Sequence, residues 1–108
     1  MKVFISQPMR GISQEEIDSR RQEIIDKIKD KYLNENIEFI YSIIIKEPPE
    51  EINYSTVWYL SKSIEKLADA TLVYFDKGWE KARGCQIEYN ICKAYNIPTI
   101  SWRELEWR

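Results

Sequence analysis

The residue of most chemical interest in this 108-residue sequence is Glu88, a carboxylate inside a helix predicted over Arg83–Tyr95. Helical spacings of three and four give this helix an inward stripe made up of Gly84, Ile87, Ile91 and Tyr95. Glu88 lies on the adjacent line with Cys85 and Cys92, so we expect it to flank the inward face. A partly buried carboxylate costs free energy unless it is paired or has a chemical use.

Two interpretations of Glu88 stay open at this point. In the first, the carboxylate extends to water or pairs with a nearby cation, for which Arg83, Lys81 and Arg10 are the candidates. In the second, it takes part in chemistry. The sequence contains no His, the usual acid or base of neutral pH, so any catalysis has to use carboxylates, Tyr, Lys or Cys.

The two cysteines, Cys85 and Cys92, are seven residues apart. On one helix this spacing separates them by about 10 Å along the axis, too far for a disulfide. Two Cys without any His also make a poor metal site. We therefore expect small buried thiols in a reducing compartment, with no metal and no cofactor.

Short apolar runs alternate with amphipathic stretches, which predicts an α/β domain. The expected strands are Lys2–Ser6, Ile37–Ile45 with an alternative end near Ser42, Thr71–Phe75 and Pro98–Trp102. Three helices are expected. The first begins after a capping box of Ser13 and Glu16 and runs to about Tyr32, the second runs from Thr56 to Ala68, and the third runs from Arg83 to Tyr95. This order favours a small Rossmann- or flavodoxin-like three-layer sandwich with a mostly parallel sheet of four or five strands.

Two helix ends carry specific expectations. Ser55 or Asn53 can cap the second helix, whose inward residues are expected to be Val57, Leu60, Ile64, Leu67 and Ala68. Asn96 is expected just past the end of the third helix, with Pro98 beyond it.

Length, charge and hydropathy limit the function. The length fits one domain over residues 1–108. The net charge of −2 gives no basic field, which argues against a nucleic acid polymer as partner. No apolar run approaches the ~18 residues of a membrane span, and the N-terminal run is too short for a signal peptide, so we expect a cytoplasmic protein without a membrane partner.

Ligands of parallel sheets bind outside the carboxyl ends of the strands, here at the loops Gln7–Ser13, Ser42–Asn53 and Asp76–Ala82. The segment SQPMRG (Ser6–Gly11) suits an anionic or ribose-bearing ligand, with Arg10 on a phosphate or carboxylate, although it fits a plain turn as well.

Asp76 ends the third strand where a ligand would meet it. The only glycines, Gly11, Gly78 and Gly84, fall in these loops or at helix starts, which ordinary turn chemistry explains almost as well.

Three stretches resemble the nucleoside 2-deoxyribosyltransferase-like superfamily, in particular its small phage and bacterial members grouped as a domain of unknown function. They are FISQPMRG (Phe4–Gly11), VWYLSKSIEKLADATLVYF (Val57–Phe75) and GWEKARGCQIEYNICKAYNIP (Gly78–Pro98), and they cover nearly half the chain. The most specific is the third, whose Gly-x-x-x-Glu at Gly84–Glu88 is similar to the segment that holds the family's catalytic glutamate.

The resemblance implies that Glu88 attacks the anomeric carbon of a 2-deoxyribonucleoside, forms a covalent glycosyl-enzyme and passes the sugar to another base or to water. It also implies ligand-facing roles, which we assign to Ser6, Gln7, Met9, Arg10 and Gly11 in the first loop and to Asp76, Gly78 and Gly84 near the third. Trp79 and Tyr89 are candidates to stack on a base, or to pack in a core or interface.

The sequence departs from the family where Ser61 and Ala82 replace its helper residues, an Asp and an acidic or hydroxyl residue. Asp76 or Tyr41 are candidates to substitute, and the departure bears on turnover more than on binding. We therefore keep three functions: an N-glycosidic hydrolase or transferase on a (2-deoxy)nucleoside or its 5′-phosphate, a non-catalytic module that senses or sequesters a nucleotide, and a structural protein.

Four Trp and seven Tyr exceed what one small core needs, and such residues favour interfaces. Members of the resembled family commonly assemble as dimers or larger. We expect a homo-oligomer, with Trp102 and Trp107 as candidate contacts.

Overall fold

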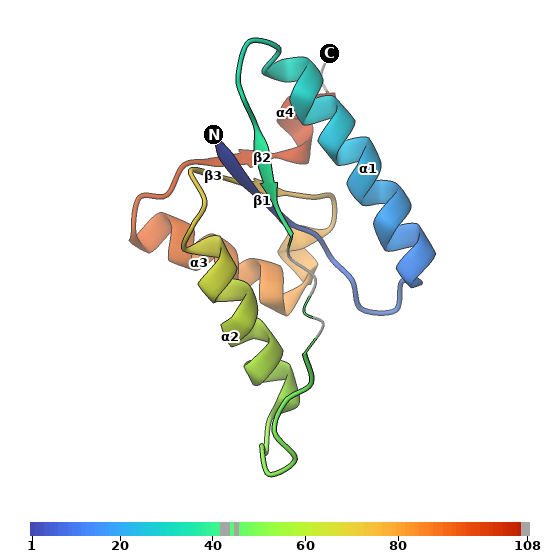
Figure 1. Ribbon diagram of the computed structural model, residues 1–108, viewed down its shortest axis with the longest axis vertical. Coiled ribbons are helices and arrows are strands. Elements are labelled where there is room, and N and C mark those ends of the chain that lie inside the picture. The colour runs from blue at the N-terminus through green and yellow to red at the C-terminus, as the bar shows by residue number, and fades with distance from the viewer. Residues whose placement is uncertain (42–43, 45, 107–108) are drawn as a thin grey trace.

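A parallel sheet of four strands forms the centre of the computed structural model, which describes residues 1–41, 44 and 46–106 (Figure 1). The strands are β1 (Lys2–Ser6), β2 (Glu38–Ile40), β3 (Leu72–Phe75) and β4 (Thr99–Ser101), in the order β2-β1-β3-β4. The helices are α1 (Gln14–Lys31), α2 (Ser55–Leu67), α3 (Arg83–Ala94) and α4 (Trp102–Glu106), with a 3-10 turn η1 (Trp79–Lys81). Each pair of neighbouring strands is parallel, which confirms the expected small Rossmann/flavodoxin-like fold.

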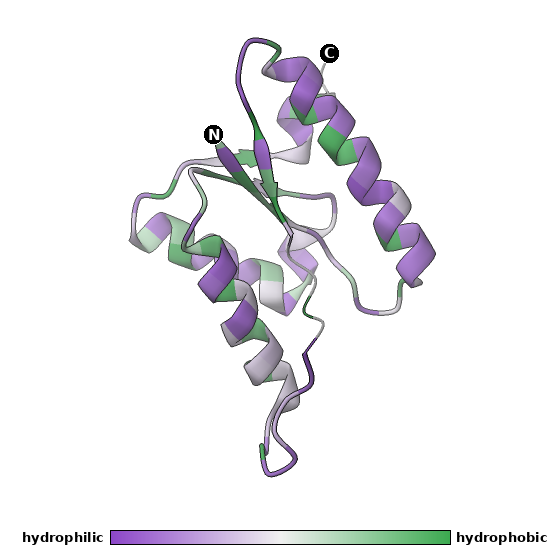
Figure 2. Cartoon of the chain, viewed as in Figure 1, coloured by the Kyte–Doolittle hydropathy of each residue, from purple (hydrophilic) through white to green (hydrophobic). Residues whose placement is uncertain are grey.

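Helices cover both faces of the sheet, with α1 and α4 on one side and α2 and α3 on the other (Figure 1). Side chains of a strand alternate between the faces. One core layer therefore holds Val3, Ile5, Ile24, Ile28, Leu72, Tyr74, Ile100 and Leu105. The opposite layer holds Phe4, Leu67, Val73, Phe75 and Cys92. Figure 2 shows the central strands as mostly hydrophobic segments and α1 as mostly hydrophilic.

The longest helix, α1, begins as its sequence predicts. The Ser13 hydroxyl accepts a hydrogen bond from the Glu16 backbone N–H at 3.2 Å, and acidic residues occupy the first turn. Its buried residues, Ile17, Ile24 and Ile28, recur at helical spacing. Among the described residues, no helix combines the length and apolar character that a membrane crossing needs.

The third helix ends with a left-handed residue, as expected. Asn96 has φ 56°, a conformation that Asn tolerates better than most residues. The backbone N–H of Ile97 bonds the Cys92 carbonyl at 2.9 Å, which satisfies a carbonyl of the last turn. Proline follows at position 98, just before β4.

Other element ends differ from the prediction. The second strand stops at Ile40, and residues 42, 43 and 45 of the predicted strand lie outside the described part of the chain. Tyr54, which makes no side-chain capping bond, stands at the N-cap of α2, so the prediction of Ser55 or Asn53 was wrong. Trp102 begins the short helix α4 rather than ending a strand.

The second helix is less buried than its periodicity predicts. Leu67 is its buried residue, whereas Val57 is 60% exposed and Ala68 is also exposed. The first half of α2 extends away from the sheet (Figure 1). Its apolar side chains at that end therefore line a cleft or face solvent instead of filling the core.

Candidate functional site

A cleft of about 850 Å³ opens at the carboxyl end of the sheet. It lies where strand order reverses, between β1 and β3, which is the expected ligand position in such a fold. The end of β1 and the loop after it, the loop before α3, the start of α3, and the first half of α2 form its lining. Glu88 is part of that lining.

Glu88 occupies the centre of the buried face of α3 rather than its flank. The buried residues of this helix are Cys85, Glu88 and Cys92, at spacings of three and four. Ile87 and Tyr95, which were predicted to point inward, are 41% and 76% exposed. The inward stripe is therefore displaced by one position from the predicted one, because the helix turns its two thiols to the sheet while Ile87 and Tyr95 point outward.

Two hydroxyl groups hold the Glu88 carboxylate. Ser6, the last residue of β1, donates to Oε1 at 2.8 Å, and Ser63 on α2 donates to Oε2 at 2.8 Å. Ser6 has the same strand parity as Phe4, so it points to the face that α2 and α3 cover. One carboxylate thereby joins β1, α2 and α3.

No ion pair within the described residues involves Glu88, although its side chain is only 5% exposed. The proposed cation partners Arg10, Lys81 and Arg83 line the cleft instead. Burial raises the pKa of Glu88, and the hydrogen bonds from the two serines act against that rise. The pairing interpretation is therefore wrong, and what remains is a carboxylate held by neutral donors.

The thiol of Cys85 also lines the cleft, one turn before Glu88. Burial raises its pKa to about 11, which the neighbouring Ser6 hydroxyl partly opposes. The thiol is therefore protonated at neutral pH and a poor nucleophile. In the described ranges, no three His, Cys, Asp or Glu side chains form a group that could hold a metal ion.

The structure gathers most of the sequence-predicted site residues around the cleft. Those that line it with Glu88 are Ser6, Gln7, Met9, Arg10, Gly78 and Gly84. Those that lie outside its lining are Gly11, Asp76, Trp79 and Tyr89. Gly11 is an exposed turn residue with φ 77°.

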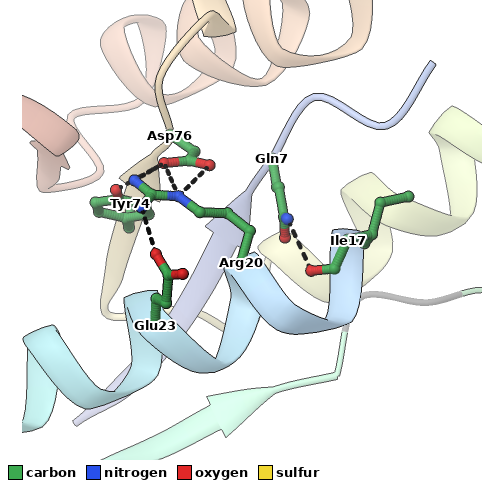
Figure 3. Close-up of polar contacts among 6 residues, drawn as sticks. All are labelled: Gln7, Ile17, Arg20, Glu23, Tyr74 and Asp76. Carbon is green, nitrogen blue, oxygen red and sulfur yellow. Dashed lines mark hydrogen bonds and ion pairs between the residues drawn. The ribbon is translucent and has the colours of Figure 1, made fainter. Parts of the chain in front are cut away.

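Two residues of the ligand-end loops have clear structural tasks. The Gln7 side chain is 8% exposed and donates through Nε2 to the Ile17 carbonyl at 3.0 Å, which ties the first loop to α1 (Figure 3). Gly78 has φ 89°, where most residues with a Cβ would be strained. It lets the chain turn from β3 toward the start of α3.

Asp76 belongs to the opposite face of the sheet. It shares the parity of Leu72 and Tyr74, which point toward α1. Arg20 of α1 donates to both of its carboxylate oxygens, with the shortest contact at 2.8 Å, and the Tyr74 hydroxyl donates to Oδ1 at 2.9 Å (Figure 3). The Asp76 carboxylate is thus occupied by α1, away from Glu88.

Trp79 and Tyr89 stack on each other, with ring centroids 4.4 Å apart and planes inclined by 28°. Both rings also contact Phe75, and they pack against the apolar layer under α2 and α3. Of the two uses considered from the sequence, the structure places them in the core packing.

Neither residue considered as a substitute for the Asp of the resembled superfamily reaches Glu88. Tyr41 does not line the cleft, and its ring lies near Arg21 and Lys66. Ser61 is exposed and donates to the Trp58 carbonyl at 2.7 Å. Ala82 does line the cleft but carries no polar side-chain group.

Sequence reasoning missed the contribution of α2. Ser63 contacts Glu88, and Tyr59, one turn earlier, lines the cleft. Ser63 lies between Leu60 and Leu67 at spacings of three and four, so helical periodicity had placed it on the inward face. A polar residue on the inward face of a helix was thus the feature of the sequence that could have identified Ser63 as a site residue.

A comparison with protein-family models found no match for the chain, and comparisons with curated proteins and with solved structures found none of significant similarity.

The raised pKa of Glu88 predicts a stability effect. A carboxyl group whose pKa is higher in the folded protein favours folding when protonated, and that contribution is lost as pH rises from 4.5, its ordinary value, through the folded value. We predict that Glu88→Gln is more stable than the wild type at pH 8 and that the difference shrinks as pH falls toward 4. Urea denaturation at several pH values measures this.

The matched control is Glu65→Gln, an exposed carboxylate on α2 that pairs with Lys62. Its effect should stay within about 0.5 kcal/mol at every pH. A Glu88→Gln difference that is the same at pH 4 and pH 8 would contradict a raised pKa.

Proposed function

We propose that this protein cleaves or transfers at the N-glycosidic bond of a (2-deoxy)nucleoside or its 5′-phosphate, with Glu88 as the nucleophile. The observation that carries the proposal is a buried carboxylate with no cation partner in the described chain, facing a cleft at the switch point of the sheet. A buried charge left without a counter-ion is costly to folding, so it is typical of a functional site.

The two walls of the cleft support a ligand of the nucleotide type. The wall opposite α2 carries three cations: Arg10 in the loop after β1, Lys81 at the end of η1, and Arg83 at the start of α3. The start of α3 has no side-chain cap. Cations and free helical N–H groups suit a phosphate. The wall made by α2 carries Val57, Leu60 and Tyr59, which suit a flat base.

The proposed chemistry follows that of a retaining glycosidase. A Glu88 oxygen attacks the anomeric carbon, the bond from this carbon to the base nitrogen breaks, and the base leaves with the electron pair and takes a proton from water. A second water, or another base, then attacks the same carbon, gives a proton to the hydroxide left by the first water, and releases Glu88 as a carboxylate. The hydroxyls of Ser6 and Ser63 keep the carboxylate oriented in both steps.

A second candidate is a nucleotide-binding module without catalysis. Among the described residues that line the cleft, Glu88 is the only carboxylate, so this lining contains no second carboxylic acid that could protonate a departing base. The exposed Ser61 and the apolar Ala82 favour this alternative. It predicts nucleotide binding in the same cleft with no release of base.

Incubation of the protein with nucleosides and nucleotides distinguishes the two functions. We predict that the protein releases free base from at least one 2-deoxynucleoside or its 5′-monophosphate, detected by chromatography, and that Glu88→Ala lowers the rate about a thousand-fold or more. Glu65→Gln is the control and should retain the wild-type rate.

Binding of the same nucleotides, measured by calorimetry, is the second half of the test. Tight binding of these nucleotides without base release from any of them would support the binding module and would reject the proposed enzymatic activity. Equal rates for the wild type and Glu88→Ala would reject Glu88 as the nucleophile.

We also propose that the chain forms a homo-oligomer, through the exposed start of α2. Tyr54 is 73% exposed and Val57 60% exposed, on a helix end that contacts little else. Trp102 packs partly against the core beside α1, so it is a weaker candidate than the sequence indicated, and Trp107 lies outside the described residues.

Light scattering should give a mass of twice 13.0 kDa or more, and Tyr54→Glu should lower it because a charge cannot be buried there without a partner. Tyr95→Glu, at an equally exposed tyrosine on α3, is the control. A wild-type mass of one chain would reject the oligomer.

A further inference from the structure

Ser63 is the only contact of α2 with the carboxylate among the described residues. Its hydroxyl donates to Oε2 of Glu88 at 2.8 Å, across the gap between α2 and α3. The other oxygen, Oε1, already accepts from Ser6 of β1 at the same distance. The carboxylate plane is therefore fixed by one donor from the sheet and one from a helix that also walls the cleft.

We propose that Ser63 is a positioning residue for Glu88, which orients Oε2 toward the cleft and replaces the cation that would otherwise stabilise the carboxylate. This inference rests on the proposed function, because a nucleophile is what such positioning serves. It adds a residue that the family resemblance does not supply.

A neutral donor suits a nucleophile better than a cation does. A Lys or Arg in contact would neutralise the carboxylate charge and lower its tendency to attack carbon. A hydroxyl stabilises the ionised form while leaving the charge on oxygen. Burial raises the pKa of Glu88, and the two serine donors act against that rise without an ion pair among the described residues.

Few charged or titratable groups surround Glu88. On α3, burial raises the pKa of Cys85 and of Cys92 to about 11, so both thiols stay uncharged near neutral pH. The cations that line the cleft are Arg10, Lys81 and Arg83. Asp76, beyond the end of β3, is held by Arg20 on the opposite face of the sheet. The hydroxyls of Ser6 and Ser63 are therefore the neighbours whose removal should act most directly on the ionisation of Glu88, and Ser63 is the one that α2 supplies.

Two readouts on Ser63→Ala, Ser63→Thr and the wild type test the proposal. The first is the titration midpoint of Glu88, followed by carbon NMR of the side-chain carboxyl. The second is the pH profile of base release. Loss of the hydroxyl should move the midpoint and the acid limb of the profile together to higher pH, and should lower kcat about ten- to hundred-fold with little change in KM.

Ser63→Thr keeps a hydroxyl and should restore both the midpoint and kcat toward the wild-type values. Ser61→Ala is the matched control, because that hydroxyl lies two residues away on the same helix and bonds the Trp58 carbonyl. It should move neither readout. Circular dichroism checks that each variant is folded, and Ser63→Cys, of similar size, replaces Ser63→Ala if that variant is not.

The outcomes separate the two proposals. An unchanged Glu88 midpoint in Ser63→Ala would overturn the role of Ser63 whatever the enzyme does. A shifted midpoint in a wild type that releases no base would reject the proposed function, and with it a role in positioning a nucleophile. Loss of activity in Ser63→Thr equal to that in Ser63→Ala would mean that packing, not the hydroxyl, matters.

Discussion

Burial of the Glu88 carboxylate between β1, α2 and α3 is the constraint on which the rest of the site depends. A charge in that position has to be satisfied, and within the described part of the chain its hydrogen-bond donors are the hydroxyls of Ser6 and Ser63. Ser6 must therefore end its strand pointing to this face, and α2 must lie close enough for a serine to bridge to α3. The cleft is the space left where these three elements meet at the carboxyl end of the sheet.

Strand parity divides the polar residues of that end between two faces. The Ser6 side chain points toward α2 and α3 and donates a hydrogen bond to Glu88. The Asp76 side chain points to the opposite face of the sheet and accepts hydrogen bonds from Arg20 of α1. The two carboxylates are close in sequence and follow the same strand end, yet one is neutralised by an arginine and the other is held by hydroxyls. This division leaves Glu88 without an ion pair among the described residues, whereas Asp76 fastens α1 to the sheet.

The alternation of strands and helices could be predicted from the sequence because each element carries its own periodicity and breakers. The displaced stripe of α3 could not, because Ile87 and Cys85 are both apolar and only the packed sheet decides which of them turns inward. Asp76 was expected near Glu88 because it follows the third strand. Asp76 lies two residues after Tyr74, however, so both side chains point to the α1 face of the sheet, away from Glu88. Ser63 was overlooked because helical periodicity places it on the inward face of α2 but does not name its partner, which lies on another element.

The proposed role of Glu88 can be tested by a crystal structure of Glu88→Gln with a 2-deoxynucleoside 5′-monophosphate, since this variant retains the shape of the site without the proposed nucleophile. We expect the anomeric carbon about 3 to 3.5 Å from the side-chain oxygen at position 88, with the phosphate beside Arg10, Lys81 and Arg83. A nucleotide bound outside the cleft, or one whose sugar faces away from position 88, would contradict it.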